Sequence, residues 1–204
     1  MDTLIVDTQE IIEESLKKSI DYNQYIQLTQ EMVEKNSTTG NDKTETFIEY
    51  TKLNQKRMNR WNKTLKISKE NQESISKFDG ETTWLVLSET WCGDAAHILP
   101  VMNKITALNS NINLHIVLRD ENEELMDAFL TNGGRSIPKL IALNEDKEVI
   151  GTFGPRPSEA TQMVNDYKEK HGQLTPEFKQ ELQVWYNKDK GQNTINDLLQ
   201  LLKD

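Results

Sequence analysis

The sequence predicts an α/β protein whose mixed β-sheet is covered by helices. From residue 82 onward, short apolar runs typical of buried strands alternate with amphipathic segments of helical period. Clusters of Gly, Asn and Asp separate these runs. The resulting order, strand–helix–strand–helix–strand–strand–helix, is typical of a mixed sheet with helices on its faces. The predicted strands are 82–88, 112–118, 138–143 and 148–153.

The residues before the first strand are predicted to be helical and polar. One apolar stripe at helical spacing predicts a single helix that ends at the turn residues 36–42. This stripe consists of Ile12, Leu16, Ile20, Tyr25, Leu28 and Met32. In a second helix, Phe47, Tyr50 and Trp61 are predicted to pack against the sheet, with a ligand groove as the alternative. Ser68 is predicted to cap a third, shorter helix.

Helices are also predicted between and after the strands. The segment 121–130 is predicted to be one helix, and Ser158 is predicted to cap another that ends at Gly172. Thr175, which Pro176 follows, is predicted to cap the next helix. The chain is expected to have three parts: a helical N-terminal extension packed on the core at 1–75, an α/β domain at 76–172 and a C-terminal helical tail at 173–204.

The charge and the cysteine content argue against several classes of protein. The 204 residues include 24 Lys and Arg and 33 Asp and Glu, so the formal net charge is 24 − 33 = −9. An acidic chain without a basic stripe is poorly suited to bind nucleic acid or an anionic membrane. No apolar run is long enough to span a bilayer, and residues 1–10 lack the pattern of a secretory leader. Because a single cysteine cannot form an internal disulfide, we expect a cytoplasmic protein.

The most specific motif follows the first predicted strand. Cys92 lies in the run Trp-Cys-Gly-Asp-Ala at 91–95, and Pro100 lies eight residues after this cysteine. Ile137 and Pro138 follow a Gly-Arg-Ser run before the third strand. These spacings, together with the order of elements over about half the chain, resemble the thioredoxin family. The resemblance implies a thioredoxin-like fold, a cis Ile137–Pro138 bond and a redox site at the start of a helix.

Two features depart from the pattern of that family. Ala95 stands where a dithiol thioredoxin has its second cysteine, so no internal thiol can resolve a mixed disulfide. Val86 and Arg119 stand at the positions of the family's buried acid and buried lysine. The flanking helices, with the run Trp-Tyr-Asn-Lys-Asp-Lys-Gly at 185–191, resemble those of a bacterial group of thioredoxin-like proteins.

Cys92 is the candidate catalytic residue. A helix N-terminus favours a thiolate, whereas the Asp94 carboxylate disfavours one, so we predict an exposed thiol with a mildly lowered pKa. The resemblance implies substrate contact for the neighbours of this cysteine and for the cis-proline loop. These residues are Trp91, Gly93, Asp94, Ala95, Ile137 and Pro138. The predicted partners are protein or small-molecule thiols and disulfides, and no cofactor is expected.

Three functions are compatible with these residues. Monothiol thiol–disulfide exchange through Cys92 is favoured, which leaves open whether the protein turns over as an enzyme. The alternative is a non-catalytic binding or adaptor module on the same fold, and a weaker one is a peroxide sensor. The sequence does not define an oligomeric state.

The other chemistry-bearing residues are predicted to be structural or solvated. His97 is predicted to be exposed on the side of the helix away from Cys92. The three histidines and the single cysteine show no metal-ligand spacing, so no metal is expected. A basic face of the second helix is predicted to be solvated surface. This face consists of Lys52, Lys56, Arg57, Arg60 and Lys63.

Overall fold

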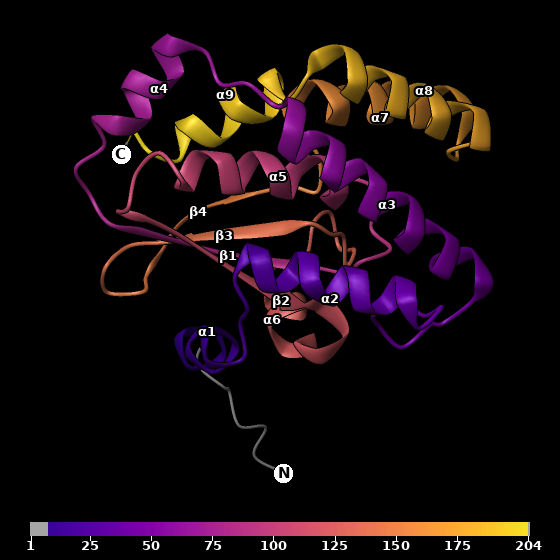
Figure 1. Cartoon of the computed structure of the whole chain (residues 1–204), viewed down its shortest axis with the longest axis horizontal. Helices are drawn as coiled ribbons and strands as arrows, with labels where there is room; N and C mark the ends of the chain where they lie inside the picture. Colours follow the sequence, from indigo (N-terminus) through magenta and orange to yellow (C-terminus); the bar gives the residue numbers. More distant parts are fainter. Residues whose placement is uncertain (1–7, 204) are drawn as a thin grey trace.

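A computed structural model describes residues 8–203; residues 1–7, which cover most of the segment considered for a leader, and residue 204 lie outside the described part. The centre of the fold is a four-stranded mixed sheet in the order β2–β1–β3–β4 (Figure 1). β1 is parallel to β2 and antiparallel to β3, which is antiparallel to β4. The strands are β1 (Thr82–Ser88), β2 (Ile112–Leu118), β3 (Lys139–Leu143) and β4 (Val149–Phe153). All four predicted strands are confirmed, two of them beginning one residue late.

Helices cover both faces of the sheet. α5 (Ala95–Thr106) and α9 (Gln192–Gln200) lie on one face, and α1 (Thr8–Lys17) and α6 (Glu123–Ala128) lie on the other (Figure 1). The remaining helices are α2 (Tyr22–Glu34), α3 (Glu45–Thr64), α4 (Lys69–Ser76), α7 (Ser158–His171) and α8 (Pro176–Asp189). Within residues 8–203, no helix combines the length and the apolar character needed to cross a membrane.

The N-terminal helices contribute to the same core as the sheet. Ile12 of α1, Tyr25 of α2 and Trp61 of α3 belong to the buried cluster that includes Trp84 of β1. A second, smaller cluster lies between α7 and α8. It consists of Ala160, Val164, Phe178, Leu182 and Tyr186. The first part of the chain therefore packs on the core through buried apolar side chains, while the boundaries at 75 and 172 remain a prediction.

The prediction of one helix across residues 12–32 is wrong. The chain breaks into α1 and α2 because Asp21 caps α2. Its carboxylate accepts a hydrogen bond from the N–H of Gln24 at 2.8 Å, and the Gln24 side chain accepts one from the N–H of Asp21 at 2.8 Å. Just before this cap, Ile20 and Ile116 of β2 exchange backbone hydrogen bonds of 2.9 and 2.8 Å in an antiparallel bridge.

Two further helix predictions need correction. The helix expected at 121–130 is shorter, because a 3₁₀ turn at Arg119–Glu121 precedes α6. Ser158 is the first residue of α7 and not its cap, and α9 supplies the capping groups. Asp197 accepts from the N–H of Ser158 at 2.6 Å, and Asn193 accepts from the N–H of Glu159 at 2.9 Å. The predicted caps Ser68 and Thr175 and the end of α7 at Gly172 are confirmed.

Candidate functional site

The turn between β1 and α5 holds the cysteine motif. The N–H of Cys92 donates to the carbonyl of Glu89 at 3.0 Å, and the Cys92 carbonyl accepts from the N–H of Ala96 at 3.2 Å. Cys92 therefore stands at the entrance to α5, as the sequence predicts. The Ile137–Pro138 peptide bond is cis, and the carbonyl of Ile137 lies 3.2 Å from the Cys92 sulfur.

A cluster of buried threonine hydroxyls anchors this turn to the N-terminal helices. Thr90 Oγ1 lies 3.1 Å from Thr39 Oγ1, 3.2 Å from Thr51 Oγ1 and 3.3 Å from Thr38 Oγ1. Asn54 of α3 donates to the carbonyl of Thr90 at 3.0 Å. Thr38 and Thr39 belong to a segment that the sequence indicates only as a turn, so its composition gives no sign of this contact. The cluster fixes the backbone two residues before Cys92.

Cys92 is buried, which contradicts the prediction of an exposed thiol. Only 6% of its surface is exposed, and its Sγ donates to the Ile137 carbonyl. The pKa of Cys92 is raised to about 12, first by burial of the thiol and second by the negative charge of Asp94. The backbone N–H groups of Ala95 and Asp94 lower this pKa. The start of the helix thus acts in the predicted direction, but desolvation of the thiolate outweighs it.

Asp94 joins the motif to the C-terminal part of the chain. Its carboxylate pairs with the Arg156 guanidinium at 2.7 Å and accepts a hydrogen bond from the Tyr186 hydroxyl at 2.9 Å. Burial raises the pKa of Asp94, while Arg156 and Tyr186 both lower it. The Arg156 guanidinium and the Tyr186 hydroxyl thus favour the charged form of Asp94, but burial outweighs them and the pKa of this carboxyl stays raised. Arg156 and Tyr186 were not among the predicted site residues, since neither lies in a motif.

Replacement of Asp94 tests its effect on the thiol. Asp94→Asn removes the negative charge and leaves Arg156 without its counter-ion, so we expect the pKa of Cys92 to fall by roughly 1. The dependence of thiolate absorbance or alkylation rate on pH measures this change. Asp166→Asn, which removes an exposed carboxylate of α7, is the control and should leave the pKa of Cys92 unchanged. An equal or higher pKa in Asp94→Asn would show that Asp94 does not act on the thiol.

His97 is buried, contrary to the prediction of an exposed side chain. Trp61 Nε1 donates to His97 Nδ1 at 2.8 Å, so the ring proton resides on Nε2, which donates to Gln183 Oε1 at 2.7 Å. The imidazole also stacks on the Tyr186 ring with centroids 4.3 Å apart. Burial lowers the pKa of His97 to about 4. This neutral histidine connects α3, α5 and α8 and is not a partner of Cys92.

A cavity of about 620 Å³ borders the motif, and we call it the Cys92 cavity. Five of the seven predicted site residues line it, namely Trp91, Cys92, Gly93, Asp94 and Ile137. Ala95 and Pro138 are buried and do not line the cavity. Further walls come from α3, from the loop after β4 and from the start of α8.

Aromatic and basic side chains lie together on one wall of the Cys92 cavity. The Trp91 ring stacks on Phe47 with centroids 4.5 Å apart, and the Arg119 guanidinium lies 5.0 Å from the Trp91 ring centre. Tyr50 also lines the cavity and is 41% exposed. The prediction that Phe47 and Tyr50 pack between a helix and the sheet is therefore wrong, whereas Trp61 is buried in the core as predicted.

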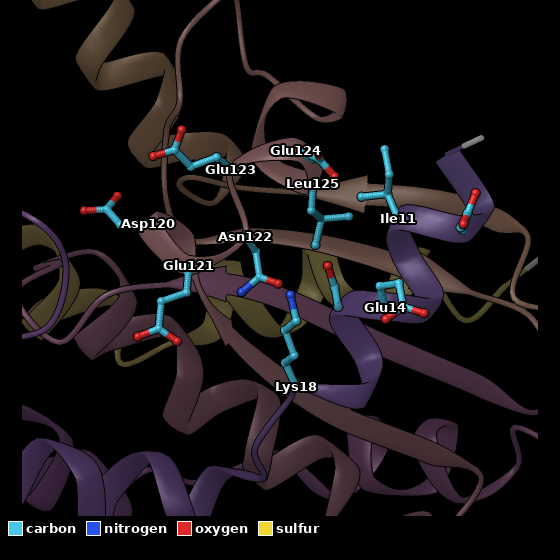
Figure 2. Close-up of a pocket in the computed structure, with 11 residues that line it drawn as sticks. Ile11, Glu14, Lys18, Asp120, Glu121, Asn122, Glu123, Glu124 and Leu125 are labelled. Atoms are coloured by element: carbon cyan, nitrogen blue, oxygen red, sulfur yellow. The ribbon is translucent and has the colours of Figure 1, made fainter. Parts of the chain in front are cut away.

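A second hollow, of about 440 Å³, lies between α1 and α6 (Figure 2). Among the residues that the structure describes, six carboxylates and one cation, Lys18, line it. Figure 2 shows the side chains of Asp120, Glu121 and Glu123 pointing in different directions. Across the part of the chain that the structure describes, no three His, Cys, Asp or Glu side chains are grouped so that they could hold a metal ion.

The fold and the motif together define a thioredoxin-like protein. The family model described as thioredoxin matches residues 40–168, which is more than half of the chain. The chain belongs to the thioredoxin family.

Solved structures agree with this fold. One is a protein of unknown function from Pseudomonas aeruginosa, with 18% identity, a TM-score of 0.66 and coverage of 94% of this chain and 96% of that one. Another is an HIV epitope-scaffold, with 19% identity, a TM-score of 0.64 and the same coverage. At these identities the similarity shows the fold alone. No curated protein matches the chain.

Proposed function

We propose that this protein is a thioredoxin-fold binding protein, which holds a ligand in the Cys92 cavity and keeps Cys92 as a protonated thiol. The observation that supports this most directly is the buried Sγ of Cys92, which donates to the Ile137 carbonyl at 3.2 Å. With a pKa of about 12, the thiolate that thiol exchange requires is scarce at neutral pH. Ala95 removes the resolving thiol as well.

The lone cysteine also supports a cytoplasmic location, because disulfides form mainly in oxidising compartments.

The cavity itself supports a binding role. Its volume of about 620 Å³ falls within the range of small-molecule sites, which is ~300–1,000 Å³. Its walls combine aromatic and aliphatic side chains with polar and charged groups that can orient a ligand. The Thr90 cluster and the Asp94–Arg156 pair hold two of its edges in place before any ligand arrives.

The reactivity of Cys92 tests this proposal. At pH 7 we expect iodoacetamide to alkylate Cys92 at least ~100-fold more slowly than a free cysteine, because the thiol is buried and its pKa is raised. The same chain in denaturant serves as the control and should react at the rate of a free cysteine. A folded protein that reacts as fast as the denatured one would contradict the proposal.

Monothiol exchange is the second candidate, because Cys92 borders the cavity beside Ile137 and the cis Pro138. In that reaction the Cys92 thiol would lose its proton, and its sulfur would attack one sulfur of a disulfide substrate. The substrate S–S bond would break, the departing sulfur would take up the proton, and an external thiol would then release the mixed disulfide. Mass spectrometry after incubation with glutathione disulfide separates the candidates, since a one-to-one adduct on the folded protein favours exchange.

A further inference from the structure

The two hollows of this protein differ in the sign of their charge. Six acids and one lysine line the hollow between α1 and α6. Five cations and a single acid, Asp94, line the Cys92 cavity. These cations are Arg57, Arg119, Arg135, Arg156 and Lys179. In a chain whose net charge is −9, such a concentration of positive side chains in one cavity needs a specific explanation.

Three of the five cations are neutralised by carboxylates. Arg119 pairs with Asp120 at 2.7 Å, and Arg156 pairs with Asp94 at 2.7 Å. Arg135 binds both oxygens of a third carboxylate, that of Asp127, at 2.6 Å each. Their charge is therefore largely balanced within the protein, and they shape the cavity more than they attract a ligand.

Arg57 and Lys179 differ from these three cations. Within residues 8–203, no carboxylate lies within ion-pair distance of either side chain. Arg57 is half-buried and donates only to the neutral Asn54, at 2.9 Å. Its Nη1 lies 3.6 Å from the position that a Cβ on Gly93 would take, so the guanidinium lies against the cysteine motif. Burial lowers the pKa of Arg57, and the charge of Asp94 opposes this shift without forming an ion pair with the guanidinium.

We infer that the Cys92 cavity binds a small ligand that has an anionic group and an apolar body. The anion, a carboxylate or a phosphate, pairs with Arg57 and Lys179, and the apolar body contacts the aromatic wall formed by Phe47, Tyr50 and Trp91. This inference rests on the proposed binding function and names the class of ligand. It also assigns a role to Arg57, which the sequence indicates only as part of a solvated basic face.

The test uses three probes of one shape: 1-naphthoate, 1-naphthyl phosphate and the neutral 1-naphthamide. Calorimetric titration is expected to show that at least one anion binds ~10-fold or more tightly than the amide, and that raising the salt concentration weakens binding of the anion only. The tighter of the two anions identifies the head group as carboxylate or phosphate. If the amide binds as tightly as both anions, or if no probe binds, the inference is wrong.

Variants locate the anion within the cavity. Arg57→Met and Lys179→Met each remove one charge and should weaken binding of the anionic probe by ~5-fold to 20-fold. Lys63→Met on α3 and Lys188→Met on α8 are matched controls, since both side chains are exposed and neither lines the cavity. Equal losses in the variants and the controls would overturn the assignment. Thermal unfolding of each variant verifies that it is folded.

The outcomes separate this inference from the proposed function. A protein with a slow Cys92 alkylation rate that binds none of the probes refutes the anionic ligand and leaves the inert thiol standing. A protein that binds the anion but alkylates rapidly at Cys92 refutes the proposed inert thiol and keeps the anion site.

Discussion

Gly154→Ala is expected to destabilise the protein by about 3 kcal/mol or more. A Cβ at this position would lie 2.2 Å from the backbone oxygen of Pro138, far inside van der Waals contact. The φ angle of +111° at Gly154 is also one that residues with a Cβ rarely adopt. Because the atom in the way belongs to backbone, neither a rotamer change nor a small side-chain shift relieves the overlap. Urea unfolding followed by tryptophan fluorescence measures the loss.

Gly133→Ala is the matched control for this substitution. Gly133 also has a positive φ, +76°, but a Cβ there would meet no atom within 4 Å. Gly133→Ala should therefore lower the free energy of unfolding by only ~1 kcal/mol, the penalty for the backbone conformation alone. Equal losses in free energy of unfolding for the two variants would show that the contact with Pro138 does not matter. If the Gly154→Ala variant folds, we also expect faster alkylation of Cys92. A shift of Pro138 would move the preceding residue, Ile137, whose carbonyl accepts a hydrogen bond from the Cys92 thiol.

The free energy of unfolding is expected to fall as the pH drops from 6.5 to 4, with a contribution from His97. Burial lowers the pKa of His97 from 6.5 to about 4 in the folded protein. Between these values the unfolded chain binds a proton that the folded protein does not bind, so acid favours unfolding. The contribution of His97 is fully present above pH 6.5, and roughly 2–3 kcal/mol of it is lost by pH 4.

Comparison with His97→Gln isolates this contribution from that of the carboxylates, which titrate in both proteins. The variant should be less stable than the original protein at pH 7, because Trp61 and Gln183 lose a well-placed partner, and it should lose less stability between pH 6.5 and 4. His171→Gln, which replaces an exposed histidine of α7, should keep the original pH dependence. An unchanged pH dependence in His97→Gln would argue against a buried neutral imidazole.

The sequence predicts the strands well because each is an apolar run bounded by turn residues. It also predicts where the motif lies, since the turn after β1 and the Ile137–Pro138 loop are local features with characteristic spacing. The environment of Cys92 could not be predicted in the same way. Its burial depends on a carbonyl 45 residues away, and its nearest charge is balanced by Arg156, 62 residues further along than Asp94.

The errors at His97 and Arg57 have a similar cause. Helical geometry correctly turns His97 away from Cys92, but that side of α5 is covered by Trp61 and Gln183, 36 and 86 residues away in sequence. Arg57 lies among polar neighbours along α3, and only the packing of that helix across the motif brings its guanidinium next to Gly93. In both cases a polar side chain is buried by segments that no local pattern identifies.

The backbone bridge between Ile20 and Ile116 has a consequence for how copies of this chain meet in concentrated solution. β2 is an edge strand, and unpaired edges invite strand pairing between molecules, which leads to aggregation. Ile20 occupies the hydrogen-bonding groups at the middle of that edge, and the Ser19 hydroxyl lies 2.7 Å from His115 Nδ1 beside it. The opposite edge, β4, exposes 41% of Val149 and 47% of Ile150. Any strand pairing between molecules is therefore expected at β4 and not at β2. Lys147 and Glu148 lie just before β4, and charged side chains at the edge of a sheet disfavour such pairing.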